Sequence, residues 1–155
     1  MTVRKLGPEE IEMAKALFIL FQTNAGASIP HVPTDEYLND RLGQGNFHVI
    51  VAVKDNFLVG GLTAFELPMY KSDAREMFLF EIDVAPAFRR QGIAKQLVTH
   101  LSTLCREKGI AEMFVLTSRT NIAAIKLYES VGGLPDLDSL MFSFNLKTQP
   151  CWPTI

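Results

Sequence analysis

The sequence has little of several residue types and patterns, and each shortage excludes a class of protein. Its 155 residues include only two cysteines, Cys105 and Cys151, which argues against a disulfide scaffold and predicts reduced thiols in a cytoplasmic protein. No apolar run approaches the roughly 20 residues that a membrane-spanning helix needs, and the first residues show no signal-peptide pattern. The three histidines lack metal-ligand spacing, so we expect no metal site. With a net charge of -2, we expect binding to neither nucleic acid nor membrane.

What is present is the composition of a globular domain. Hydrophobic residues make up 48% of the chain and aromatic residues 10%, which is sufficient for one buried core. The length fits a single domain. No repeat, low-complexity tract or interior linker divides the sequence, so we expect one domain over residues 1–146 and a peripheral tail over residues 147–155.

Hydrophobic periodicity predicts the order helix, helix, three strands, helix, strand, helix and strand. That order indicates an α+β fold in which helices flank a mixed sheet. We expect the helices to begin near Pro8, Thr34, Ala94 and Asn121, and the strands to span residues 47–53, 57–65, 77–85, 112–117 and 140–146.

The strongest functional signal is the segment 88–95, between a predicted buried strand and the helix that follows it. Unpaired backbone N–H groups and a partial positive charge at a helix N-terminus favour phosphate oxygens. Gly92 lets the backbone approach a ligand closely, and the small Ala94 keeps the first turn open. The segment therefore predicts a pyrophosphate-binding turn. Its cationic side chains are Arg89, Arg90 and Lys95.

The pattern Arg89-x-x-Gly92-x-Ala94 resembles the acyl-CoA signature, Gln/Arg-x-x-Gly-x-Gly/Ala, of the GCN5-related N-acetyltransferases (GNAT). This resemblance implies acetyl-CoA as a co-substrate. It also implies a mixed, mostly antiparallel sheet of six to seven strands flanked by about four helices. In the family two central strands splay apart around the cofactor, and here they would be the strands 77–85 and 112–117.

A second pattern, Asn121-x-x-Ala124-x-x-x-Tyr128-x-x-x-Gly132, resembles the distal motif of the same family, with Gly133 in place of an aromatic residue. Helical spacing places Asn121, Ala124 and Tyr128 on one face. The resemblance implies that Asn121 binds the cofactor and that Tyr128 protonates the departing thiolate. The alternatives are a helix cap for Asn121 and a core tyrosine with a satisfied hydroxyl for Tyr128. The implied acyl-CoA contacts are Ile82, Asp83, Val84, Arg89, Arg90, Gln91, Gly92, Ile93, Ala94, Lys95, Asn121, Ala124 and Tyr128.

Two carboxylates, Glu81 and Asp83, alternate onto one face of the predicted strand 77–85. Buried without partners they would be costly, so one interpretation is a structural salt bridge to Arg75 or Arg119. The other is that the pair faces the cleft and binds an ammonium group, with the pKa of one carboxyl raised enough to take its proton. We favour Glu81 as the base and Asp83 as the substrate anchor, with the reverse assignment open. The predicted catalytic residues are Glu81, Asp83 and Tyr128.

Further segments, including Leu67-Pro68-x-Tyr70 and Asp35-x-Tyr37-Leu38, resemble the small aminoglycoside 3-N-acetyltransferases, whose acid equivalent to Glu81 is an aspartate. This resemblance implies acetylation of an aminoglycoside amine, hence antibiotic resistance, and a homodimer. The predicted substrate-binding residues are Asp35, Tyr37, Tyr70, Glu81 and Asp83.

An acidic cleft would concentrate such a polycation. Two alternatives stay open: an N-acetyltransferase for a polyamine, amino sugar, protein lysine or N-terminus, and a non-catalytic acyl-CoA-binding protein. The acids expected around the cleft are Asp35, Glu36, Asp40, Glu66, Asp73, Glu81, Asp83, Asp136 and Asp138.

Overall fold

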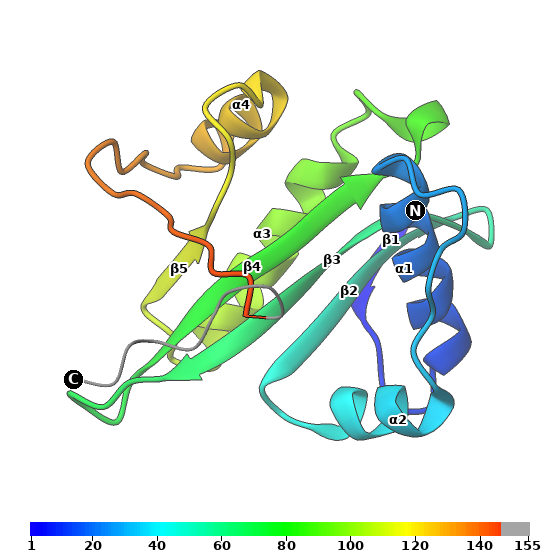
Figure 1. The fold of residues 1–155 in the computed structure, drawn as a ribbon, viewed down its shortest axis with the longest axis horizontal. Helices are drawn as coiled ribbons and strands as arrows, with labels where there is room; N and C mark the ends of the chain where they lie inside the picture. The colour runs from blue at the N-terminus through cyan, green and yellow to red at the C-terminus, as the bar shows by residue number, and fades with distance from the viewer. Residues whose placement is uncertain (147–155) are drawn as a thin grey trace.

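Five strands form one sheet in the computed structural model, which describes residues 1–146 (Figure 1). The first four strands pair antiparallel in chain order, and the fifth pairs parallel with the fourth. The predicted α+β class is confirmed, with one or two strands fewer among the described residues than expected. The strands are β1 (Thr2–Lys5), β2 (Phe47–Lys54), β3 (Phe57–Pro68), β4 (Arg75–Val84) and β5 (Glu112–Val115).

Helices cover both faces of this sheet (Figure 1). The first two pack on one face and the third on the opposite face, while the fourth lies beyond β5. The hydroxyl of Thr34 accepts the N–H of Tyr37 and caps the second helix, as its sequence predicts. Within residues 1–146, no helix has the length and apolarity needed to cross a membrane. The helices are α1 (Ile11–Asn24), α2 (Asp35–Gly43), α3 (Ile93–Glu107) and α4 (Ile122–Ser130), with a 3-10 turn at Pro86–Phe88.

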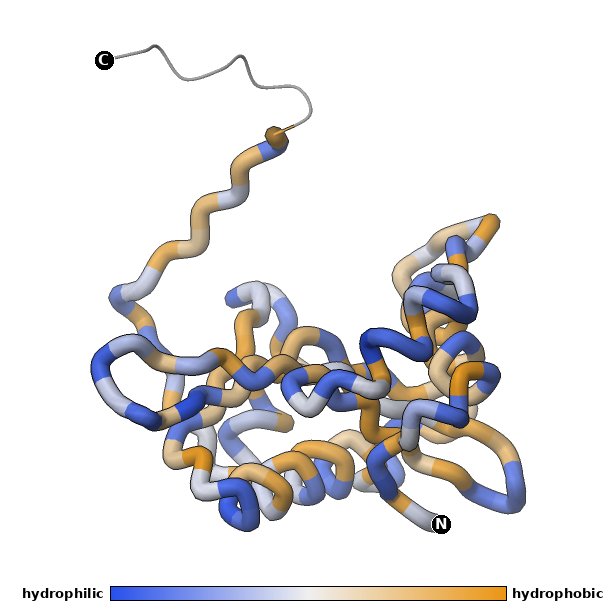
Figure 2. The backbone as a smooth tube through the Cα atoms, turned by 90° about the horizontal axis from the view of Figure 1, so that it is seen from below, coloured by the Kyte–Doolittle hydropathy of each residue, from blue (hydrophilic) through white to orange (hydrophobic). Residues whose placement is uncertain are grey.

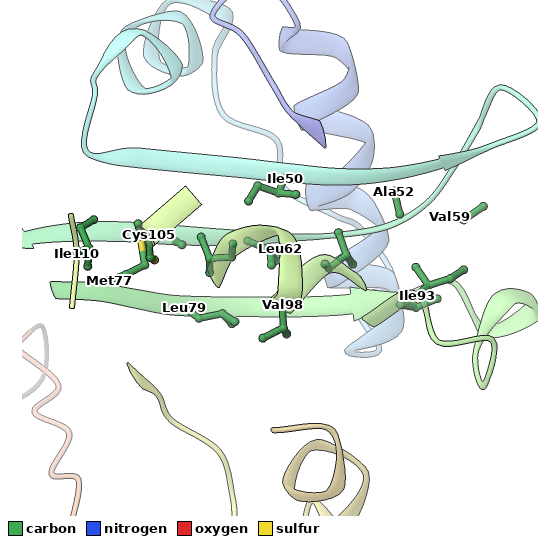
Figure 3. Close-up of a cluster of buried hydrophobic side chains, with 14 residues drawn as sticks. Ile50, Ala52, Val59, Leu62, Met77, Leu79, Ile93, Val98, Cys105 and Ile110 are labelled. Carbon is green, nitrogen blue, oxygen red and sulfur yellow. The ribbon is translucent and has the colours of Figure 1, made fainter. Parts of the chain in front are cut away.

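The core is divided by the sheet, and β2 is buried on both of its faces. Val49 and Val51 pack with α1, whereas Ile50 and Ala52 point to the α3 side (Figure 3). The apolar stripe of α3 covers the second cluster, as the spacing of its apolar residues predicts. The stripe consists of Ile93, Leu97, Val98, Leu101 and Cys105.

Two elements differ from the sequence prediction. Residues 140–146 are not a strand in the described part of the chain, so the predicted last strand is wrong for this structure. An alternating pattern specifies strand conformation but needs a neighbouring edge to become part of a sheet. Conversely, Thr2–Lys5 forms β1 although four residues with two charges give no recognisable pattern. The predicted tail 147–155, with Cys151, lies outside the described residues.

A β-bulge in β4 decides which face its carboxylates occupy. Thr63 of β3 lies opposite Glu81, but the next residue, Ala64, lies opposite Leu79. Phe80 is therefore an extra residue on β4.

The extra residue shifts the alternation of side chains along β4. Leu79 is in the core cluster on the α3 side, and after the bulge Val84 joins the same cluster, with Ile82 packed against it. Without the bulge Glu81 and Asp83 would occupy these core positions. With it, both carboxylates point to the face covered by α1.

Candidate active site

The parallel pair β4–β5 opens into a wedge. The two strands are paired only from Glu76 to Leu79 and from Glu112 to Val115. Beyond this point β4 continues to Val84, while the chain after β5 turns away to α4. The predicted splaying of these strands is confirmed. A pocket of about 620 Å³ lies in the wedge, lined by β4, the start of α3 and α4.

The start of α3 presents unpaired N–H groups to this pocket. Gly92 is the N-cap, with a left-handed φ of 77°, and its carbonyl accepts the first helical bond, from the N–H of Gln96. The N–H groups of Ile93, Ala94 and Lys95 therefore have no partner within the helix. All three residues line the pocket. The segment has the geometry of an anion site, as the sequence predicts.

The three predicted cationic side chains all lie at the helix start, but they are not equally free to bind an anion. Arg90 and Lys95 are exposed and line the pocket. Arg89 also lines the pocket, but its guanidinium is bonded to β4, where Nε donates to the carbonyl of Val84 at 2.9 Å. Gln91 does not line the pocket; its side-chain oxygen accepts from a lysine of β2. Its contact with the cofactor remains a prediction.

Asp83 is held by several donors at the end of β4. One oxygen accepts the N–H of Val84 at 2.7 Å and pairs with the Arg89 guanidinium at 3.2 Å. The other oxygen accepts from the amide of Asn24, the last residue of α1, at 2.7 Å. These bonds fix the carboxylate and tie α1 to the rim of the wedge.

Glu81 is different, because no described residue forms a hydrogen bond or ion pair with its side chain. The predicted partners, Arg75 and Arg119, bond elsewhere. Burial within the wedge, and then the negative charge of Asp83, raise the pKa of Glu81. Glu81 lines the pocket and still reaches solvent. It is therefore an available proton acceptor with increased basicity.

Tyr128 and Asn121 face the same pocket from α4. The side-chain oxygen of Asn121 accepts the N–H of Ala124 at 3.1 Å, so the residue caps α4 and keeps its NH₂ group for a ligand. Burial raises the pKa of the Tyr128 phenol. The hydroxyl consequently keeps its proton at neutral pH and can donate it.

The open edge of β4 offers one further donor. Ala85 donates its N–H to Val59 of β3, so the N–H groups of Val84 and Ile82, by alternation, point into the wedge. The Val84 N–H is occupied by the Asp83 carboxylate. The Ile82 N–H is the one that can bind a carbonyl oxygen placed in the wedge.

Three predicted substrate-binding residues lie outside the lining of this pocket. Asp35 pairs with Lys15 at 2.5 Å, and the Tyr37 ring lies against the guanidinium of Arg41, 5.6 Å from the ring centre. Tyr70 is 90% exposed in the loop before β4. The structure does not bring these residues to the wedge, and their part in acceptor binding stays a prediction.

Glu66 does not rim the cleft, so that expectation is wrong. It is 4% exposed and accepts hydrogen bonds from His48 at 2.7 Å and Arg75 at 2.8 Å, and it pairs with Lys108 at 2.9 Å. Burial raises the pKa of Glu66, but the bonds from Lys108 and His48 outweigh it and leave the pKa lowered. Burial also lowers the pKa of His48, which is thus neutral at neutral pH. The sequence did carry one indication of this buried role, because Glu66 is an isolated acid near the end of an apolar strand.

Phe80 is a pocket residue that the sequence pattern does not predict. Its ring is 58% exposed and lies edge-on to Phe65 at 5.8 Å and to Phe78 at 5.7 Å. Because Phe80 is the bulged residue, no pattern in the sequence placed it beside Glu81. The other wall residues that were missed are Phe88, Val115, Leu116, Thr117, Ala123 and Leu127.

Comparisons with known proteins agree with this geometry. The sequence pattern of the acetyltransferase (GNAT) family matches residues 14–133. Two crystal structures of an aminoglycoside acetyltransferase from an uncultured soil metagenomic sample, in complex with trehalose and with sisomicin, are 29% and 28% identical. Each superposes with a TM-score of 0.88 and covers 94% of this chain and 95% of that chain.

A curated relative has a different kind of acceptor in its name. The [ribosomal protein bS18]-alanine N-acetyltransferase of Escherichia coli (strain K12) is 37% identical over 73 residues, which are 47% of this chain and 48% of that protein. The chain thus spans about two-fifths to one half of the length of the curated relatives that it matches in this group.

Proposed function

The chain belongs to the acetyltransferase (GNAT) family, and from this premise we propose that it transfers acetyl from acetyl-CoA to an amine of an aminoglycoside. One observation carries the proposal: a single pocket contains an anion-binding helix start, an unpaired carboxylate and a protonated phenol. Acyl transfer to an ammonium acceptor can use all three. A non-catalytic acyl-CoA-binding protein would need only the first.

The residues of the wedge fit the diphosphate and thioester of acetyl-CoA. The N–H groups of Ile93, Ala94 and Lys95 would bind the diphosphate oxygens, with the Arg90 side chain beside them. The free amide NH₂ of Asn121 faces the same space. When bound, the co-substrate supplies an activated acetyl group as a thioester.

The chemistry then follows from three groups on two elements. Glu81 removes a proton from the acceptor ammonium, which frees the amine to form the new C–N bond. The Ile82 N–H stabilises negative charge on the carbonyl oxygen during attack. As the C–S bond breaks, Tyr128 protonates the leaving sulfur, and the second proton, which the new amide nitrogen loses, returns to the Tyr128 oxygen. The products are an acetamide and a free thiol.

An aminoglycoside is the acceptor best supported by the comparisons. The two soil-sample structures, which superpose with 94% of this chain, are named as an aminoglycoside acetyltransferase. The carboxylates Glu81 and Asp83 suit a polycation, and the exposed Phe80 ring offers an apolar surface to a sugar ring. By its sequence resemblance the enzyme would modify the 3-N position. A cytoplasmic location also remains a prediction.

The experiment is a thiol-release assay with acetyl-CoA and a panel of amines. We expect turnover with sisomicin and related aminoglycosides, and an acetyl group at N3 in the NMR spectrum of the product. The panel includes spermidine and a peptide with an N-terminal alanine. Turnover with the peptide alone would transfer the assignment to protein N-termini, and binding of coenzyme A without any turnover would support the non-catalytic alternative.

A further inference from the structure

The carboxylate of Asp83 receives hydrogen bonds on both of its oxygens at the end of β4. Its Oδ1 accepts the backbone N–H of Val84 at 2.7 Å and a guanidinium N–H of Arg89 at 3.2 Å. Its Oδ2 accepts the side-chain amide of Asn24 at 2.7 Å. An ionised carboxylate has roughly four acceptor positions. The described residues therefore occupy three of them and leave one, on Oδ2, for a ligand in the pocket that Asp83 lines.

Asn24 is the donor that comes from another part of the fold. Arg89 follows Asp83 by six residues, whereas Asn24 is the last residue of α1 and precedes Asp83 by 59 residues. Because the two nearer donors both hold Oδ1, the direction of Oδ2 is set by Asn24. A side-chain amide is neutral, so it orients the carboxylate without cancelling its negative charge.

The packing of α1 on β3 brings Asn24 to this position. Gly61 lies opposite Asp83 in β3, and a Cβ added there would come within 2.7 Å of the Leu17 side chain. The missing side chain thus lets α1 lie close to the sheet beside Asp83. Leu17 and Phe21 are buried on α1, and hydrophobic residues recur between hydrophilic ones along the backbone (Figure 2). Apolar packing therefore holds α1 in place, and we expect the fold to survive replacement of Asn24.

We propose that Asn24 is a positioning residue for acceptor binding: it holds Asp83 so that the remaining acceptor position of Oδ2 receives an ammonium group of the substrate. This inference rests on the proposed function, because it takes Asp83 as the group that binds the acceptor. Glu81 and Asp83 are two residues apart on one face of β4, which separates their Cα atoms by roughly 7 Å. A polycation can therefore place one ammonium group at Asp83 and another amine at Glu81. Asn24 is not in the pocket lining and acts through Asp83.

The first experiment measures thiol release and calorimetric binding of sisomicin, the latter in the presence of coenzyme A. We expect Asn24→Ala to raise the KM and the dissociation constant of sisomicin by about 10-fold, because a hydrogen bond to a charged group is lost. The KM of acetyl-CoA should be unchanged. The matched control is Asn39→Ala, the same substitution at an exposed position of α2, which should alter none of these values. Unchanged sisomicin affinity in Asn24→Ala, with only a lower unfolding temperature, would reduce the residue to a structural contact and overturn the proposal.

The second experiment asks whether Asn24 acts through Asp83. In the Asp83→Ala background, replacing Asn24 by alanine should change kcat/KM for sisomicin by no more than about twofold, because interacting residues are non-additive. Independent effects of the two replacements would contradict the proposal.

The outcomes also separate this inference from the proposed function. If the parent chain binds sisomicin without acetylating it, the proposed function fails, and the sisomicin affinities of Asn24→Ala and of the double variant still decide the role of Asn24. If the parent chain does not bind sisomicin, both fail.

Discussion

Glu81→Gln removes the proposed base while keeping the shape of the side chain. A positioned general base contributes roughly 10²–10⁴-fold to the rate of proton transfer steps. Because Glu81 reaches solvent, water can replace it in part, so we expect the lower half of that range. The variant should lower kcat/KM at pH 7 by about 10²–10³-fold, equivalent to roughly 3–4 kcal/mol of transition-state stabilisation. The affinity for coenzyme A should be unchanged.

The pH dependence of kcat/KM provides a sharper test of the same role. The base must be ionised, and its pKa is raised above the ordinary 4.5, so activity is lost as the pH falls through this raised value. Asp83→Asn removes the negative charge that contributes to the raised pKa of Glu81, so the loss of activity at acidic pH should move to lower pH. Burial is the larger cause of the raised pKa and remains in this variant, so the loss should still occur above the pH expected for an ordinary glutamate. In Glu81→Gln this acidic fall of kcat/KM should disappear.

The assay is thiol release with sisomicin from pH 5 to pH 9.5, at fixed ionic strength and with the fold checked by circular dichroism. At high pH the acceptor amine loses its own proton, so the deficit of Glu81→Gln should shrink. The control is Asp55→Asn, which removes a carboxylate at the β2–β3 turn where asparagine tolerates the positive φ of 52°. A Glu81→Gln variant with at least one third of the parent activity and an unaltered pH profile would refute this mechanism.

Three further predictions concern other residues. Tyr128→Phe should slow acyl transfer by about 10²-fold, which is at the low end for acid catalysis because a thiolate leaves readily. The affinity for coenzyme A, measured by calorimetry, should be retained. A large loss of this affinity would mean that Tyr128 is a packing residue. Gly92→Ala should lower the unfolding free energy by about 1–2 kcal/mol in urea denaturation, because φ is 77° while the added Cβ meets nothing within 4 Å; no loss would contradict the left-handed turn. Glu66→Gln should lower the free energy of unfolding by about 2–3 kcal/mol. This is less than the loss expected on breaking a fully buried ion pair, because Arg75 and Lys108 reach solvent. The pKa of Glu66 is lowered in the folded state, so its contribution is complete above the unfolded pKa and is lost as the pH falls; the variant should flatten this decline, and parallel pH curves would argue against it.

The sequence predicted those parts of the site that depend on local pattern. The anion site at Gly92 could be recognised because a strand, a glycine turn and an amphipathic helix are consecutive in the chain. The cap formed by Asn121 and the shared face of Glu81 and Asp83 are local features of the same kind. Each depends on spacing within one element, which sequence periodicity describes directly.

The parts that could not be predicted depend on contacts between distant elements. The bulge at Phe80 is a mismatch between two strands, and it has no signature in either strand alone. The contact of Asn24 with Asp83 joins residues from α1 and β4, and the turning of Arg89 toward β4 depends on the same carboxylate. The pattern of residues 140–146 predicts a strand, but the described structure has none there, because strand formation depends on pairing with another element.

The cluster around Glu66 has a consequence for how the molecule meets its ligands. A single carboxylate fastens β2, β3, β4 and the end of α3 together through His48, Arg75 and Lys108. This junction sits at the start of β4, whereas the strands part at the other end. The strands are thus fastened together at the end of β4 that lies away from the pocket and are apart at the pocket, so the fold itself sets the width of the opening. Ligand binding should then require little rearrangement, because the conformational entropy of the site is lost during folding rather than at each binding event.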